Sequence, residues 1–488
     1  MKLTLTGHSY KYAVEQIMLA LFPGEKPTYS QNDDMQITAE SRMTYGSTYA
    51  QTATIIENGG VKFRGVARVS RGRLTDKLVT DRLLQRIVKQ SFFRAAAGLL
   101  PAPPEWGSLT GIRPAKIIEG DLSSGCSVKS AVKKLVGDYY VSPERALLCV
   151  DAAQTALAVG KTIEPRDIAL YIGIPFCPTR CAYCSFVSNS AEKSFALVEP
   201  FIETLLDEIR TASDTVRELG LRVVSIYIGG GTPTSLPDDS LEAVMRAVSD
   251  MFDVSFVREY TVEAGRPDTI TPEKLRIISN MGAGRVCVNP QSMSADVLQA
   301  IGRKHTPGDV MDAVSNVKRF GLALNMDIIA GLPEDDREGF SSTLDAVLDL
   351  EPGNVTVHTL SLKKGSRIML ESTDIPGGAE VAAMLAFALK RLRGSGYVPY
   401  YLYRQKFTSG GFENTGWSLP GCECLYNVCM MEDLCTVISL GGGGVTKIVA
   451  HGGRIERIFN AKYPREYIAR TEKIDAKFNL IKEMYRRG

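Results

Sequence analysis

Residues 168–184 read IALYIGIPFCPTRCAYC, and this stretch decides the fold. Its first nine residues are mostly apolar, as is typical of a buried strand. The loop that follows carries Cys177, Cys181 and Cys184. Thiolates hold iron–sulfur clusters, and a cluster usually has four thiolate ligands. Three clustered cysteines would therefore leave one iron open to another ligand. The alternatives are a zinc site that lacks a ligand, or thiols without a metal. No histidine stands nearby in the sequence to complete a zinc tetrahedron.

Beyond this loop, short strand-like runs alternate with longer amphipathic helical stretches. This alternation predicts repeated βα units on a parallel sheet, an α/β fold. In (β/α) barrels the loops after the strands build the active site. We therefore expect polar residues at the strand ends to meet around one rim. The six strand candidates are residues 168–176, 223–231, 259–265, 285–292, 324–333 and 354–362. The rim residues that they place are the three cysteines, Gly230, Gly231, Thr232, Glu263, Gln291, Asp327 and His358.

Two other regions flank the α/β domain, which we predict to cover residues 164–397. Residues 1–163 have the pattern of a separate α+β domain, because strand-like alternation surrounds Asn58-Gly59, a strong hairpin signal, and helical stretches follow. Residues 398–488 form a C-terminal extension that is rich in glycine, tyrosine and cysteine and ends in a charged helical stretch.

The composition excludes some classes of partner. The chain has 488 residues and a net charge of +2, which argues against nucleic acid or an acidic membrane surface as the dominant partner. The N-terminus lacks the apolar run of a signal peptide, and no stretch approaches the roughly 20 apolar residues of a membrane span. We therefore expect a cytoplasmic protein without a membrane span, in which the ten cysteines are mostly thiols.

The cysteine loop also carries a family resemblance. C-x3-C-x2-C with Tyr183 before its last cysteine is the signature of the radical S-adenosylmethionine (SAM) superfamily. The strings YIGIPFCPTRCAYCSF (171–186) and IYIGGGTPT (226–234) resemble the oxygen-independent coproporphyrinogen III oxidase family, in a variant branch with an N-terminal extension. This resemblance implies a partial (β/α)6 barrel of the TIM type, a [4Fe–4S] cluster and SAM.

The resemblance also assigns roles by position. Cys177, Cys181 and Cys184 would bind three irons, and the amino and carboxylate groups of SAM would bind the fourth. Tyr171 would lie beside the cluster, and Tyr183 against the adenine. Tyr171 also stands, with Glu263, as a candidate catalytic residue.

The remaining cofactor contacts lie farther along the chain. The turn formed by Gly230, Gly231 and Thr232 would meet the methionyl amino group, because glycine lets the backbone approach a ligand closely. Acidic or amide side chains suit ribose hydroxyls, and an arginine suits the methionyl carboxylate. The residues at these positions are Glu263, Gln291, Arg303 and Asp327.

The resemblance implies an oxidoreductase of heme biosynthesis. A 5′-deoxyadenosyl radical would abstract a hydrogen atom from a propionate of coproporphyrinogen III, and loss of carbon dioxide would leave a vinyl group. The partners would be a tetrapyrrole substrate and an external one-electron reductant of the flavodoxin or ferredoxin type. The alternatives are a heme-binding chaperone and an anaerobic heme-modifying or heme-degrading radical SAM methyltransferase.

Two departures from the best-defined oxidases leave the substrate open. Gly173 replaces a histidine, and Ser185 stands where those oxidases place an additional cysteine. The C-terminal helical domain of that group is also not recognisable.

Several other residues have two readings. His305 and His358 are structural histidines or functional ones, with His358 the better functional candidate. A second group of thiols could hold an auxiliary cluster or be buried small side chains. Three further residues could grip a tetrapyrrole or belong to an ordinary surface stripe. The thiols are Cys422, Cys424, Cys429 and Cys435, and the possible grip is Arg404, Lys406 and Trp417.

Overall fold

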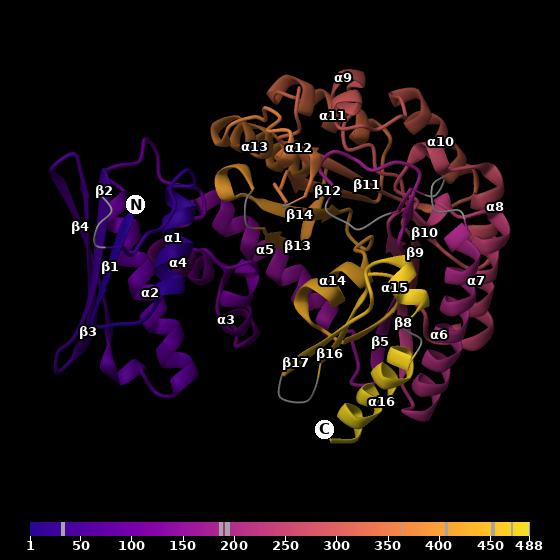
Figure 1. Cartoon of the computed structure of the whole chain (residues 1–488), viewed down its shortest axis with the longest axis horizontal. Coiled ribbons are helices and arrows are strands. Elements are labelled where there is room, and N and C mark those ends of the chain that lie inside the picture. Colours follow the sequence, from indigo (N-terminus) through magenta and orange to yellow (C-terminus); the bar gives the residue numbers. More distant parts are fainter. Residues whose placement is uncertain are drawn as a thin grey trace. The chain divides into compact units, whose positions relative to one another are not determined.

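The computed structural model describes residues 1–30, 35–184, 189–190, 196–363, 365–405, 408–449, 454–469 and 472–487. Two compact units divide the chain (Figure 1): Met1–Val150 with Gly410–Phe412, and Asp151–Ser409 with Glu413–Gly488. The boundaries drawn from the sequence at residues 163 and 397 stay a prediction.

The first unit is an α+β structure built on a four-stranded sheet in the order β1-β2-β3-β4. Strand β1 is parallel to β2, and the other neighbours are antiparallel. The strands are β1 (Lys2–Thr6), β2 (Ile37–Tyr45), β3 (Tyr49–Asn58) and β4 (Val61–Ser70). The helices are α1 (Lys11–Leu21), α2 (Lys77–Ala96), α3 (Glu119–Ser123), α4 (Val128–Tyr139) and the first part of α5 (Pro143–Gly160).

The predicted hairpin is confirmed, one residue later than the sequence signal. Strands β3 and β4 pair up to Asn58 and Val61, so Gly59 and Gly60 form the turn. Both glycines have positive φ, 57° and 82°. A two-residue turn of this kind matches the twist of the strands and favours glycine, which adopts positive φ without steric cost.

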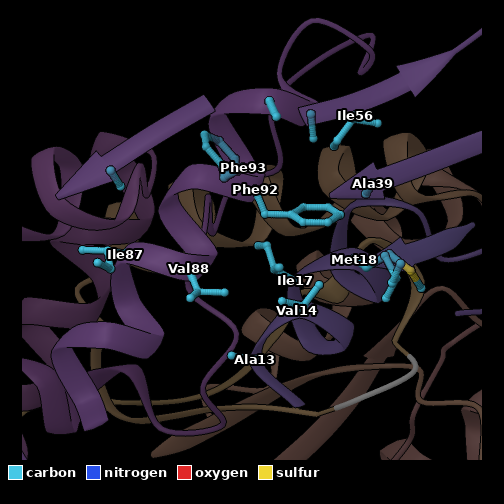
Figure 2. Packing of buried hydrophobic residues seen from close by; sticks show 14 of the residues in the cluster. Ala13, Val14, Ile17, Met18, Ala39, Ile56, Ile87, Val88, Phe92 and Phe93 are labelled. Atoms are coloured by element: carbon cyan, nitrogen blue, oxygen red, sulfur yellow. The ribbon is translucent and has the colours of Figure 1, made fainter. Parts of the chain in front are cut away.

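The core of this unit lies between one face of the sheet and helices α1 and α2 (Figure 2). Helix α1 contributes Ile17 and Met18, and α2 contributes Phe92. These residues belong to the apolar face of each helix. Ala39 of β2 and Ile56 of β3 meet them from the sheet. Alternate residues of the strands are buried, as expected for an antiparallel sheet covered on one side.

The second unit contains the predicted βα repeat. All six strand candidates are strands, and each is parallel to its neighbours among the six. They are β5 (Asp167–Ile174), β8 (Arg222–Gly230), β9 (Glu259–Val262), β10 (Arg285–Cys287), β11 (Ala323–Ala330) and β12 (Asn354–Thr359). The α/β fold class is thus confirmed.

Helices connect and cover these strands on their outer side (Figure 1). Amphipathic sequence explains this placement, since α6 and α7 each bury one apolar face. The helices of this unit are the second part of α5, α6 (Val198–Glu218), α7 (Asp238–Met251), α8 (Pro272–Asn280), α9 (Ala295–Ala300), α10 (Pro307–Arg319), α11 (Arg337–Asp349), α12 (Arg367–Leu370), α13 (Gly378–Gly394), α14 (Leu425–Glu432), α15 (Pro464–Ile468) and α16 (Glu472–Arg487). Within the described ranges, no helix is both long and apolar enough to cross a lipid bilayer.

The C-terminal residues extend this sheet at both edges. Beside β12 lie the antiparallel strands β14 (Glu413–Ser418) and β13 (Val398–Arg404). Beside β5 lies β15 (Thr436–Gly441), which is parallel to it and is followed by β16 (Val445–Val449) and β17 (Ile455–Phe459). The short strands β6 (Phe176–Cys177) and β7 (Asn189–Ser190) form a separate pair. The C-terminal extension is therefore part of the same sheet as the barrel strands.

A buried ion pair anchors the C-terminal helix. Lys477 of α16 contacts Glu208 of α6, and both side chains are at least 95% buried. Glu208 also accepts hydrogen bonds from Tyr467 and from the backbone N–H of Gly441. Lys477 donates in addition to Ser439 O at 2.9 Å. Helices α6 and α16 and strand β15 therefore share one hydrogen-bond network.

Replacing Lys477 by methionine should destabilise the protein by about 3–5 kcal/mol, because Glu208 would stay buried without its counter-charge. Urea unfolding would measure this loss. Lys482→Met is the matched control, since Lys482 pairs with Glu218 where both side chains are partly exposed. That variant should cost at most about 1 kcal/mol. Equal losses in the two variants would contradict the prediction.

Candidate active site

A cavity of about 550 Å³ lies where the parallel strands of the second unit end. Its size is in the range of small-molecule sites. The structure brings nearly all rim residues predicted from the sequence into its lining. Those that line it are Cys177, Cys181, Tyr183, Cys184, Gly230, Gly231, Thr232, Glu263, Gln291, Arg303, Asp327 and His358.

The cysteine loop is held by polar contacts to its sulfurs. Thr232 Oγ1 donates to Cys177 Sγ at 3.5 Å, and Arg266 Nη1 approaches Cys181 Sγ at 3.7 Å. Arg266 is fixed by two 2.9 Å bonds to Asp268 and also donates to Thr179 Oγ1 at 3.0 Å. The guanidinium thus places a positive charge beside a sulfur that binds metals as the thiolate.

The donor set of this loop fits an iron–sulfur cluster. The three cysteines are thiols rather than disulfides, and all three line the cavity. In the part of the chain that the structure describes, no three His, Cys, Asp or Glu side chains converge closely enough to share one metal ion. A cubane requires no such convergence, because each thiolate binds its own iron.

The glycine-rich turn lies against the cysteine loop with no room for side chains. Gly230 has φ = 109°, and a Cβ there would lie 2.9 Å from Ile174 N. A Cβ on Gly231 would lie 2.4 Å from Phe176 O and 2.9 Å from Cys177 Sγ. Gly231 N and Thr232 N each donate to backbone carbonyls of that segment at 2.7 Å. The backbone of the turn is therefore fixed at the edge of the cavity, where a ligand can approach it closely.

Three amides in the wall present oxygens that have no hydrogen-bond partner among the residues that the structure describes, Asn289 Oδ1, Gln291 Oε1 and Asn325 Oδ1. For Asn325 the orientation is clear, since its Nδ2 donates to Asp327 Oδ1 at 3.3 Å. Buried acceptors without a donor are rare and call for a ligand with N–H or O–H groups. The ammonium and ribose hydroxyls of SAM are such groups. The wall therefore fits this cofactor.

Gln291 has an unusual backbone. Its φ is 66°, in the left-handed region that residues other than glycine seldom adopt. It is held there by two hydrogen bonds with β11, since Gln291 N donates to Asp327 O at 3.0 Å and Gln291 O accepts from Ile329 N at 3.1 Å. A strained conformation held by its surroundings is typical of functional sites.

Two carboxylates and a histidine meet in the barrel. His358 Nε2 lies 3.6 Å from Asp327 Oδ2. Burial raises the pKa of Glu263 to about 7, and the charge of Asp327 adds to this rise. Burial alone would lower the pKa of His358, but the hydrogen bond and charge of Asp327 outweigh it and raise that pKa. The site therefore contains a carboxyl group that titrates near neutral pH.

The Glu263 carboxyl should make stability pH-dependent in the cofactor-free protein. Its pKa rises from 4.5 to about 7 on folding. Between these values the unfolded chain releases the proton first, so the free energy of unfolding should fall by roughly 1–3 kcal/mol as pH rises. In the Glu263→Gln variant, the free energy of unfolding should not show this part of the fall with rising pH. Urea unfolding of both proteins from below the lower pKa to above the higher one tests this, and parallel curves would contradict it.

Both terminal nitrogens of Arg303 form hydrogen bonds within the cavity wall. Its Nη1 donates to Asn289 O at 2.6 Å and to Gly265 O at 3.3 Å, and its Nη2 donates to Tyr183 OH at 3.2 Å. Its Nε lacks a partner among the described residues. These bonds fix Tyr183 beside the cysteines. A contact of Arg303 with the methionyl carboxylate stays a prediction.

Among the residues predicted to contact the cluster or SAM, Tyr171 is the one that does not line the cavity. Its ring stacks on Tyr227, with centroids 6.2 Å apart, and on Tyr426, at 5.7 Å. Tyr227 pairs with Tyr171 across β5 and β8 and does line the cavity. Tyr171 thus lies beside Tyr227 without reaching the cavity lining, and its assigned role beside the cluster stays a prediction.

The structure adds lining residues that the sequence did not single out. Arg266 and Asn289 follow strands β9 and β10, so the rule of strand ends could have found them. Six others come from C-terminal elements that no such rule covers. These are Tyr401, Tyr403 and Gln405 near β13, Asn414 of β14, and Asn427 and Met431 of α14.

The proposed tetrapyrrole grip is not supported. Arg404 is 9% exposed and Trp417 2% exposed, and neither lines the cavity. Both alternate with residues that do, so the pleat of β13 and β14 turns them to the other face. Lys406, like Ser185, lies outside the described residues. His305 is buried, does not line the cavity, and has its pKa lowered to about 4 by burial and then by Arg303.

The cysteines of the second group have three different sets of neighbours. Cys424 Sγ lies 3.2 Å from Glu259 Oε1, and Cys429 shares a hydrogen bond with Cys435. Cys422 packs against Gly353. Such distributed contacts favour the interpretation of buried small side chains.

Comparison with known proteins finds both oxidase-like proteins and heme chaperones among the relatives of this chain. The model of the radical SAM superfamily matches residues 171–347. The oxygen-independent coproporphyrinogen-III oxidase-like protein HemZ of Bacillus subtilis is 38% identical over 389 residues, 78% of each chain. The heme chaperone HemW of Buchnera aphidicola is 29% identical over 48% of this chain and 61% of its own. The solved structure of coproporphyrinogen III oxidase (HemN) from Escherichia coli is 19% identical, with a TM-score of 0.52 over 66% of this chain and 72% of its own. That structure supports the fold alone.

Proposed function

Because this chain belongs to the oxygen-independent coproporphyrinogen III oxidase-like family of the radical SAM superfamily, we propose that it converts propionates of coproporphyrinogen III to vinyl groups without oxygen. The family uses a [4Fe–4S] cluster and SAM, and its members act in heme metabolism. The observation that carries the proposal is the cavity in which three thiols, a glycine turn and unpaired amide oxygens meet.

Different residues of the chain would bind the cluster and SAM. Cys177, Cys181 and Cys184 would hold the cluster and leave one iron open. The unpaired oxygens of Asn289, Gln291 and Asn325 would accept from the ammonium and hydroxyl groups of SAM, and Arg303 would face its carboxylate. Glu263 would complete these contacts as an acceptor when ionised. Most of these partners are buried, so they would be preorganised for the cofactor before it binds.

What the two cofactors supply when bound is abstraction of one hydrogen atom by a 5′-deoxyadenosyl radical. In the proposed reaction each propionate then loses carbon dioxide and one electron, and the electron passes to an external one-electron acceptor. Two rounds yield two vinyl groups, two carbon dioxide molecules and two molecules each of methionine and 5′-deoxyadenosine. A reductant of the flavodoxin or ferredoxin type would supply one electron for each SAM.

A heme chaperone is the second candidate, because the relative from Buchnera aphidicola is named as one. Such a protein would bind heme stably and pass it on unchanged. The same cavity and cofactors would then serve binding rather than turnover.

An anaerobic assay with coproporphyrinogen III and heme in parallel tests these alternatives. Vinyl product with one deoxyadenosine for each propionate lost is the expected result. Deoxyadenosine without any change in the porphyrin would overturn the proposed reaction. Stable heme binding without turnover would favour the chaperone, and transfer of a labelled methyl group from SAM to heme would favour the methyltransferase.

A further inference from the structure

Three strands place a row of polar side chains in one wall of the cavity. Tyr403 of β13 pairs with Asn414 of β14. On the other side of β14, Val357 pairs with Thr415, which sets the next residue of β12, His358, beside Asn414. All three line the cavity. Cross-strand neighbours on one face have side chains about 4.5–5.5 Å apart, so Tyr403, Asn414 and His358 form a continuous polar row.

The amide of Asn414 has a defined orientation. The backbone N–H of Thr359 donates to Asn414 Oδ1 at 3.0 Å. A backbone N–H can only donate, so the oxygen of the amide must lie on this side and the nitrogen on the other. Asn414 is 1% exposed, and its Nδ2 has no hydrogen-bond partner among the described residues. A buried N–H group without a partner calls for an acceptor on a ligand.

Of the two neighbours of Asn414, His358 holds the amide in place and Tyr403 has a proton to donate. His358 Nδ1 lies 3.3 Å from the same Asn414 oxygen, so this nitrogen carries a proton and the ring is fixed. Tyr403 OH accepts from Gln405 Nε2 at 3.3 Å, which leaves its own proton to donate. Lys363 lines the same cavity and forms no ion pair with any residue that the structure describes. The polar row therefore offers donors, whereas the wall with Asn289, Gln291 and Asn325 offers acceptors.

The two carboxyl groups of the cavity would repel an anion in the polar row only weakly. Asp327 pairs with His358, whose Nε2 lies 3.6 Å from Asp327 Oδ2. Glu263, the other carboxyl of the cavity, is only partly ionised near pH 7, because burial raises its pKa to about 7. Donors in a site of low dielectric bind a carboxylate more strongly than they do in water.

We propose that the polar row binds a carboxylate of the substrate, with Asn414 Nδ2 as its central donor. This rests on the proposed function only in that the substrate is a tetrapyrrole with propionates, which coproporphyrinogen III and heme both carry. Two of the three residues come from strands β13 and β14, so the C-terminal extension supplies the substrate side of the site.

Asn414→Asp tests the proposal in the full-length protein with its cluster reconstituted anaerobically. Aspartate keeps the oxygen that accepts from Thr359 N but replaces the donor by a second oxygen, which would repel a carboxylate. The dissociation constant of coproporphyrin III should rise roughly tenfold to a hundredfold, and that of SAM should not change. The tetramethyl ester of coproporphyrin III, in the same detergent solution, should bind the two proteins equally.

Asn414→Leu and Asn316→Asp complete the test. Asn414→Leu removes the donor without adding charge and should also weaken coproporphyrin III binding. Asn316→Asp, on helix α10 away from the cavity lining, makes the same charge change and should leave binding as it is. Unchanged coproporphyrin III binding in Asn414→Asp, or an equal loss for the ester, would overturn the proposal. Failure of the proposed reaction would appear separately, as wild-type protein that binds porphyrin but forms no vinyl product.

Discussion

Replacing Cys181 by serine is expected to remove the cluster and to reduce SAM cleavage by more than roughly a hundredfold. Substitutions in the outer shell of a metal site already cost about 10–100-fold, and this one removes a ligand itself. Serine is a poor ligand for iron–sulfur clusters, because they select soft thiolates. Two thiolates would remain to hold a cluster that needs three from the protein. Iron and sulfide content, the electron paramagnetic resonance signal of the reduced cluster, and the rate of deoxyadenosine formation would measure the loss.

Cys126→Ser is the matched control for this prediction. Cys126 is also a partly exposed thiol, but it lies in the first unit and does not line the cavity. Its replacement should leave the iron content and the cleavage rate unchanged. A Cys181→Ser protein with a full complement of iron would contradict the assignment of this loop to the cluster.

Replacing Gly231 by alanine should reduce SAM cleavage by roughly a hundredfold, the cost of a displacement of about 1 Å at a reacting centre. The new Cβ would lie 2.4 Å from Phe176 O, a backbone atom that cannot give way without moving the cysteine loop. The same Cβ would lie 2.9 Å from Cys177 Sγ. Both the turn that faces SAM and one cluster ligand should therefore shift. Cleavage rates normalised to the iron content would separate this effect from a loss of cluster.

Gly284→Ala provides the control, because no atom lies within 4 Å of a Cβ built there. Gly284 belongs to the same unit and directly precedes strand β10. This variant should fold and cleave SAM like the wild type. If Gly231→Ala also cleaved SAM at the wild-type rate, the close packing of the turn against the loop would have no part in activity.

The C-terminal extension gives a physical reason for one departure from the best-defined oxidases. A Cβ on Gly173 would lie 2.5 Å from Gly442 O, so the segment after β15 occupies the space that a side chain at residue 173 would need. Strand β15 runs beside β5 as far as this point, where Gly441 pairs with Gly173. The same extension thus adds strands at both edges of the sheet. This is a reason to offer coproporphyrinogen III and heme side by side.

The sequence alone determined the βα repeat and the position of the cysteine loop. Periodicity and strand ends are local properties, and in a parallel sheet the carboxyl ends of the strands lie on one side whatever the details of packing. For that reason local sequence is enough to place Glu263, Gln291, Asp327 and His358 around one rim. It is not enough to predict the left-handed backbone of Gln291, since the strand-end environment and not the residue type holds it there.

Only the tertiary structure decided which side chains of the C-terminal residues face the cavity. It also decided that Tyr171, unlike the other predicted cofactor contacts, does not line the cavity. Strands β13, β14 and β15 join the sheet through long-range pairing, and a shift of one residue in their register would exchange Tyr403 for Arg404 at the cavity wall. Tyr171 stands in a strand that the sequence predicted, yet it does not line the cavity, and its ring stacks on Tyr426 of α14. Registers and such covering elements depend on contacts between residues far apart in the chain, and local sequence does not specify them.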